Sequence, residues 1–116
     1  MIKDHSKNYN DLINLIGRLG AKIPSTMKGF NSLHKASTAD GVLTSKTKEL
    51  IALGIAITVR CDGCIAFHVY EALQSGATSE EILETIGVSV MMGGGPALVY
   101  GCEAMEALEQ FVVLEH

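Results

Sequence analysis

An unbroken apolar run from Leu50 to Val59 constrains the fold of this chain more than any other segment. It reads Leu-Ile-Ala-Leu-Gly-Ile-Ala-Ile-Thr-Val and holds no charged residue. The run is too short to span a bilayer, so we expect a helix that is buried on all sides. Its branched residues would also suit a strand. However, Thr44 or Ser45 can cap a helix here, and the polar stretch Lys46–Glu49 suits its first turn.

The segments before this run carry helical signals. Apolar residues within 12–19 repeat at the spacing of one helix face, and Gly20 is the expected end of that helix. Pro24 can open a second helix, because its missing N–H costs nothing in the first turn. Asp40-Gly41 is typical of a turn.

The segments after the run continue the pattern. Asp62 can cap a helix that Gly76 ends, and Thr78–Glu81 has the sequence of a capping box. A further helix would reach about Met92, and Pro96 would begin the last one. No segment shows convincing strand alternation, so the predicted fold is all-α with about six helices.

Length and composition suit one domain that assembles. The chain has 116 residues, of which we expect 1–113 to form a single domain and Leu114–His116 to be the remnant of an expression tag. A hydrophobic content of 47% is high for so small a protein. Since a small domain buries a limited share of its surface, we expect the excess to be covered in a homo-oligomer.

Net charge and cysteine content limit the expected binding partners and cellular location. The net charge of −4 and the lack of a basic run argue against nucleic-acid binding. The N-terminus shows no apolar signal core, and three cysteines make no disulfide framework, so we expect a reducing, cytoplasmic location. Thr85–Cys102 lacks charges, but Gly93–Pro96 interrupts it, so we expect no membrane span.

A dithiol motif follows the apolar run. On a helix, Cys61, Cys64 and His68 stand at i, i+3 and i+7, within roughly 60° of one another. Glu49, twelve residues before Cys61, lies on the preceding helix and can orient His68, directly or through water. The four residues together predict thiol chemistry.

The spacing favours Cys64 as the attacking thiol. A first-turn position, His68 one turn on, and Arg60 beside Cys61 would each favour a thiolate, whereas Asp62 opposes it. Cys61 would then resolve the sulfenic acid on Cys64 by forming a disulfide. Two alternatives remain: a structural cysteine pair, and a zinc site completed by Cys102 or Glu49.

These residues resemble a known motif. Glu49, Cys61, Cys64 and His68 are similar to the core of the alkylhydroperoxidase D (AhpD)-like group in the carboxymuconolactone decarboxylase family. The likeness runs from about 43 to 111 and includes Met91 to Ala97.

The resemblance implies an all-helical fold that is often trimeric or hexameric. It also implies peroxide reduction, with Cys64 peroxidatic, Cys61 resolving, and His68 and Glu49 relaying protons. Well-studied peroxidases of the group carry a histidine directly before the second cysteine, where this chain has Gly63. The resemblance implies little decarboxylase activity.

Other notable residues have simpler interpretations. We expect Cys102 to be buried, His34 to be a hydrogen-bonded core or interface residue, and His5 to lie in a mobile tail. The glycines of 93–95 would permit close helix contact or an unusual turn. We expect core or subunit contacts from three methionines: Met91, Met92 and Met105.

The leading hypothesis is a thiol-dependent peroxidase or disulfide oxidoreductase that needs no cofactor. Its substrate would be a hydroperoxide, a dithiol donor would restore it, and Phe67 and Ile65 would wall a narrow pocket. The alternatives are a redox-sensing or oligomeric adaptor without catalysis, and a zinc-binding module.

Overall fold

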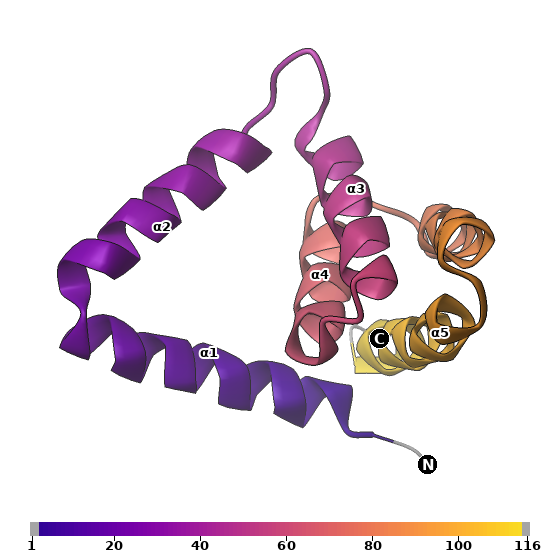
Figure 1. The fold of residues 1–116 in the computed structure, drawn as a ribbon, viewed down its shortest axis with the longest axis horizontal. Helices are drawn as coiled ribbons and strands as arrows, with labels where there is room; N and C mark the ends of the chain where they lie inside the picture. Colours follow the sequence, from indigo (N-terminus) through magenta and orange to yellow (C-terminus); the bar gives the residue numbers. More distant parts are fainter. Residues whose placement is uncertain (1–2, 115–116) are drawn as a thin grey trace.

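The computed structural model describes residues 3–114, which form five helices and no strand within that range. The helices, shown in Figure 1, are α1 His5–Lys22, α2 Pro24–Thr38, α3 Ser45–Thr58, α4 Asp62–Gln74 and α5 Ser79–Leu114. The predicted all-α fold is confirmed. Glu115 and His116, part of the expected tag remnant, lie outside the described residues.

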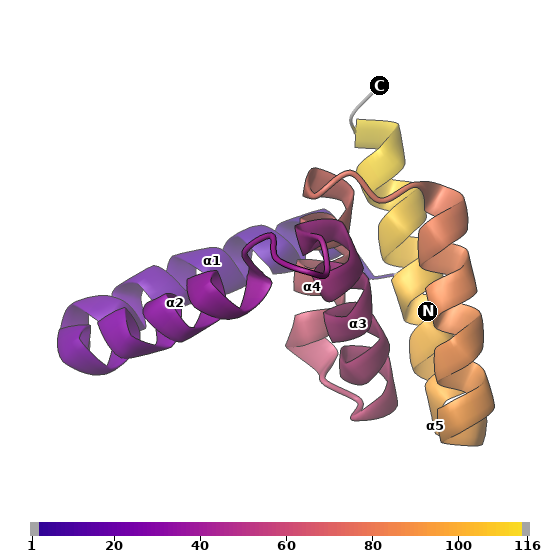
Figure 2. The same cartoon turned by 90° about the horizontal axis from the view of Figure 1, so that it is seen from above.

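Helices α3, α4 and α5 pack around one apolar core, and α1 and α2 form an arm that projects away from them (Figure 1 and Figure 2). Each fully buried aliphatic side chain contributes about 1.5–3 kcal/mol. The largest of these side chains come from all three core helices: Leu53, Ile57, Ile65, Val69 and Ile82.

The expectation that α3 is buried on every side is wrong. Leu53 and Ile57 are fully buried, but Ile51 and Ile55 on the same helix are 48% and 57% exposed. The reason is geometric: α4 and α5 cover two sides of α3, and no other described helix covers the third. The apolar sequence of α3 therefore exceeds what one copy of the chain buries.

A tight turn at the end of α3 places the first cysteine. The Cys61 N–H donates to the Ala56 carbonyl at 3.0 Å, and the Arg60 N–H donates to the Ile57 carbonyl at 3.2 Å. This pair of bonds is a Schellman motif, whose turning residue is usually glycine. Here Arg60 takes that place with φ 60°. Cys61, rather than the expected Asp62, is the N-cap of α4.

Helix α5 is a hairpin. Gly94, with φ 68° and ψ −147°, reverses the chain, so that its two arms run side by side in opposite directions (Figure 2). A Cβ on Gly101 would lie 2.9 Å from Ile86 Cγ2, which shows how closely the arms approach. The arms correspond to the expected fifth and sixth helices. Both roles expected of the glycines, a turn and a close contact, are present.

The hairpin also bears on the membrane question. By length and apolarity alone, Ser79–Val113 could cross a membrane. The reversal at Gly94 divides this segment, so it offers no continuous span.

Local signals set several helix ends as expected. Pro24 opens α2, and Thr44 caps α3. The capping box is present: the Thr78 N–H donates to Glu81 at 2.9 Å, and the Glu81 N–H donates to Thr78 Oγ1 at 3.1 Å. Gly20 does not end α1, which continues to Lys22. Ile23 alone separates α1 from α2.

The arm is anchored by its first turns. His5 is buried, its Nε2 lies 2.8 Å from Glu106 Oε1, and its N–H donates to Gln110 at 2.7 Å. The expected mobile tail at His5 is therefore wrong, because these α5 side chains hold it. Tyr9 adds an aromatic contact, with its ring centroid 4.4 Å from that of Tyr70.

Candidate active site

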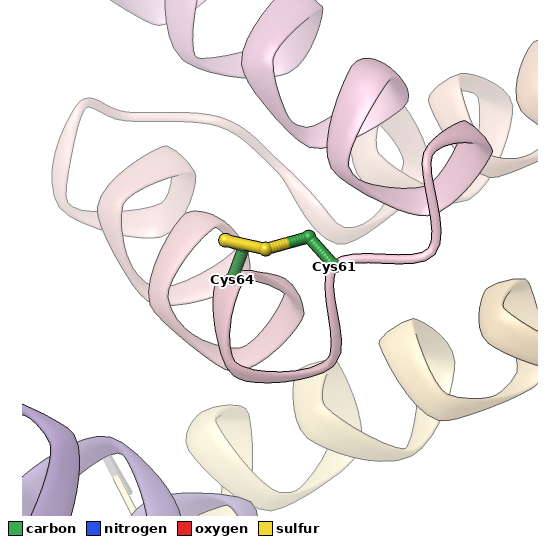
Figure 3. The surroundings of a disulfide bond; sticks show 2 residues. All are labelled: Cys61 and Cys64. Atoms are coloured by element: carbon green, nitrogen blue, oxygen red, sulfur yellow. A yellow bond between two sulfur atoms is a disulfide. The ribbon is translucent and has the colours of Figure 1, made fainter.

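Cys61 and Cys64 form a disulfide at the start of α4 (Figure 3). Cys61 lies in the segment that joins α3 to α4, and Cys64 lies in the first turn of α4. Their Cα atoms are 5.1 Å apart, within the range that a disulfide needs. Both residues are half-buried.

The position of Cys64 suits a thiolate after reduction. It is the third residue after the N-cap, where the helix dipole favours negative charge. Its backbone N–H donates to the Cys61 carbonyl at 3.0 Å, which holds the two cysteines in one turn. Arg60 is exposed and directly precedes Cys61 in the sequence.

His68 and Glu49 face each other across two helices. His68 stands one turn beyond Cys64 on α4, and Glu49 stands on α3. His68 Nδ1 lies 3.7 Å from Glu49 Oε2, and the two side chains are 20% and 4% exposed. The separation exceeds a direct hydrogen bond but lies within the distance of an ion pair. The structure thus forms two pairs, Cys61–Cys64 and His68–Glu49, and α4 carries Cys64 and His68 one turn apart.

Burial shifts the proton affinity of both groups. The pKa of Glu49 is raised above 4.5, mainly by burial, while nearby His34 opposes the shift. The pKa of His68 is lowered below 6.5, mainly by burial and further by His34, while Glu71 opposes the shift. A neutral imidazole of this kind can accept a proton from a thiol.

Sequence reasoning missed two titratable neighbours. His34 reaches the site from α2, with its ring 6.2 Å from that of Phe67. Its buried Nε2 has no hydrogen-bond partner within residues 3–114, so a hydrogen-bonded role at an interface stays a prediction. Glu71 on α4 has a raised pKa, caused first by burial and then by Glu49. Its i+3 spacing from His68 was the available signal.

Several other expectations about the surroundings need correction. Ile65 is only 1% exposed and belongs to the core, so it cannot wall a pocket. Phe67 instead joins an aromatic group with Tyr9, whose ring centroid is 6.1 Å away. Cys102 is an exposed free cysteine on α5 rather than a buried one. Met91 and Met92, 72% and 73% exposed, are not core residues of the single chain.

The described residues do not form the four-ligand zinc site that was the alternative to thiol chemistry. The two thiols are bonded to each other, and the described residues contain no group of three His, Cys, Asp or Glu side chains placed to hold a metal ion. Cys102 lies on the second arm of α5 and forms no bond with the motif.

Solved structures share this fold. A carboxymuconolactone decarboxylase family protein from Legionella pneumophila superposes with a TM-score of 0.88 and is 46% identical, covering 92% of this chain and 96% of that one. A family member from Thermotoga maritima gives a TM-score of 0.81 at 30% identity, covering 90% of this chain and 92% of that one. Its description suggests involvement in an antioxidative response.

Sequence comparison agrees. An uncharacterised protein of Cupriavidus necator is 36% identical over 105 residues, covering 90% of this chain and 93% of that protein. The family model for carboxymuconolactone decarboxylases matches residues 24–107, which include the whole dithiol motif and its neighbours on α2 and α3. The chain belongs to the carboxymuconolactone decarboxylase family.

Proposed function

We propose that this chain is a thiol-dependent peroxidase of the alkylhydroperoxidase D-like type. The observation that carries the proposal is the Cys61–Cys64 disulfide at a helix start, one turn from a buried His68–Glu49 pair. The reduced dithiol supplies two electrons as it becomes a disulfide, and the His68–Glu49 pair supplies a proton acceptor. The antioxidative description of the Thermotoga relative points the same way.

The reaction begins with Cys64. His68 takes the proton from the Cys64 thiol, and Glu49 orients the imidazole and stabilises its charged form. The thiolate attacks the outer oxygen of a hydroperoxide, the O–O bond breaks, and the alkoxide leaves. The alkoxide takes a proton and departs as an alcohol. Cys64 is now a sulfenic acid, oxidised by two electrons.

Cys61 completes the turnover. Its thiolate attacks the Cys64 sulfur, the S–S bond forms, and hydroxide leaves and takes a proton to become water. An external dithiol then reduces the disulfide through a mixed-disulfide intermediate and is itself oxidised to a disulfide. The residues require no cofactor for these steps, and a reducing cytoplasm would supply the dithiol.

Peroxide consumption with a dithiol reductant tests the proposal. Cys64→Ser should lower turnover by at least about a hundredfold, since the nucleophile is removed. Cys61→Ser should react once and stop at the sulfenic acid. Cys102→Ser is the matched control, because Cys102 is exposed and outside the motif. Full activity in Cys64→Ser would refute the assignment. Reversible disulfide formation without peroxide loss would instead favour the adaptor alternative.

We also propose that copies of this chain assemble, as trimers or hexamers. A groove of about 610 Å³ between α3 and the first arm of α5 is lined largely by apolar side chains, including Ile51, Ile55 and Met92. These three are 48%, 57% and 73% exposed, and apolar patches of this kind usually mark contact surfaces. Light scattering should show an oligomer, and Ile55→Lys should dissociate it. A monomeric parent would refute the assembly.

A further inference from the structure

Three buried polar atoms on three different helices lack hydrogen-bond partners. They are His34 Nε2 on α2, Glu49 Oε2 on α3 and His68 Nδ1 on α4, and none has a hydrogen-bond partner within residues 3–114. Buried polar groups are normally paired, so unpaired ones call for an explanation. Two of the three already belong to the proposed relay. The third, His34, has no role in it so far.

His34 is placed by packing rather than by sequence proximity to the motif. Its ring meets Phe67 edge-on at 6.2 Å, and Phe67 in turn meets His68 edge-on at 5.1 Å. Phe67 is also held from α1 by Tyr9. The arm therefore places an imidazole against Phe67, next to His68 on α4.

Titratable groups on two neighbouring helices interact with His34. Glu49 faces it from α3, and His68 and Glu71 face it from α4. From α1, Tyr9 lies close enough to Glu71 for the carboxylate to raise the pKa of the Tyr9 phenol, after burial, which is the larger cause. Two imidazoles and two carboxylates from three helices therefore interact electrostatically in one region of the structure.

We propose that His34 is a positioning residue of the thiol reaction: it favours the ionised form of Glu49 and the neutral form of His68, so that His68 can take the Cys64 proton. When His34 is protonated, its positive charge favours the Glu49 carboxylate and disfavours a second imidazolium at His68. This inference rests on the proposed function, because it assigns His34 to the same relay. It also assigns α2, which carries His34, a role at the active site.

The influence of His34 on the pKa values of Glu49 and His68 gives the direction of the expected change. Without His34, the pKa of His68 should rise and the pKa of Glu49 should rise. His68 would then hold a proton at a higher pH and could not act as a base there. The acid limb of the activity profile should move to higher pH.

The test uses the full chain and does not depend on turnover. Proton NMR follows the His68 ring through a pH titration of the oxidised protein, in the parent and in His34→Gln and His34→Phe. The phenylalanine variant keeps an aromatic contact with Phe67 but carries no charge. Lys35→Gln is the matched control, because it removes a positive charge from the next, exposed position of α2.

Both His34 variants should shift the His68 titration to higher pH, while Lys35→Gln leaves it in place. An unchanged His68 titration in both folded variants, judged by circular dichroism, would overturn the role of His34. The parallel activity profile separates the two proposals. A parent that consumes no peroxide refutes the function, whereas an active parent whose acid limb is unmoved by His34→Gln refutes only the role of His34.

Discussion

His68 Nδ1 lies 3.7 Å from Glu49 Oε2, and both atoms are buried without a hydrogen-bond partner among the described residues. Helix α3 supplies one member of the pair and α4 the other, so their register depends on the turn that carries Cys61. The dithiol and its proton acceptor are thus positioned by the same turn.

Glu49→Gln should be more stable than the parent but less active. Burial raises the pKa of Glu49 above 4.5, so ionising it in the folded state costs free energy that the unfolded chain does not pay. The cost is absent below pH 4.5 and sets in as pH rises through the raised pKa. At neutral pH, Glu49→Gln should therefore need more denaturant to unfold than the parent, with the difference vanishing in acid.

The same variant should consume peroxide more slowly, by about tenfold or more, because the imidazole loses its orienting carboxylate. Light scattering provides the control, since the assembly should be unaffected. A rate equal to that of the parent would remove Glu49 from the relay.

The buried imidazole predicts a second pH effect. Burial lowers the pKa of His68 below 6.5, so the folded state binds a proton less readily than the unfolded chain does. Stability attributable to this group is complete above pH 6.5 and declines as pH falls toward the lowered pKa. Compared with His68→Gln, the parent should lose stability over this window. Parallel stability curves for the two proteins would show that His68 titrates normally.

Gly63→His tests the position where this chain differs from the well-studied peroxidases it resembles. A Cβ here would meet only Leu12 Cδ2, at an ordinary 3.8 Å, so the helix can accept a side chain. A second imidazole beside Cys64 should speed peroxide consumption by roughly 10- to 100-fold, since positioned acid–base groups contribute about 10²–10⁴.

Gly63→Ala is the control for this change. It should stabilise α4 by up to about 1 kcal/mol without any gain in rate, because alanine is the better helix former. Equal rates in the histidine and alanine variants would show that the missing imidazole does not limit the reaction.

Arg60→Gly should raise the stability of the protein and lower the reactivity of its thiols. Arg60 adopts a left-handed conformation, φ 60°, that glycine adopts freely. Glycine there should stabilise the protein by roughly 0.5–1 kcal/mol. It should also slow the reaction of the thiols, because the positive charge beside Cys61 is lost.

The end of α4 supplies the comparison. The Ala77 N–H donates to the Ala72 carbonyl at 3.0 Å in the same type of turn, with Gly76 at φ 95° in the turning position. Gly76→Ala should cost about 1 kcal/mol or more in thermal or denaturant unfolding. Opposite signs for the two substitutions are the expected result, and matching signs would contradict the strain assigned to Arg60.

Features that depend on short-range interactions could be predicted from the sequence. Pro24, Thr44 and the Thr78–Glu81 capping box mark helix starts through bonds that span only a few residues. The i+3 and i+7 spacings of the motif likewise act within one helix. Such features do not depend on how the helices later pack, and so the all-α fold and the cysteine pair could be predicted.

Features set by packing could not be predicted. Ile55 and Ile57 are both apolar, yet one is exposed and the other fully buried, because only one side of α3 faces its neighbours. Cys102 has an apolar sequence context but lies on an uncovered face of α5. His34 reaches Phe67 across 33 positions of sequence through the fold of the arm. No spacing rule connects such distant residues.

Mass mapping of the three cysteines after one equivalent of hydroperoxide tests the central claim most directly. In the reduced parent protein, the account predicts a Cys61–Cys64 disulfide and an untouched Cys102. In Cys61→Ser, it predicts a sulfenic acid on Cys64. Oxidation that begins at Cys61 or Cys102, or three thiols left intact, would contradict it.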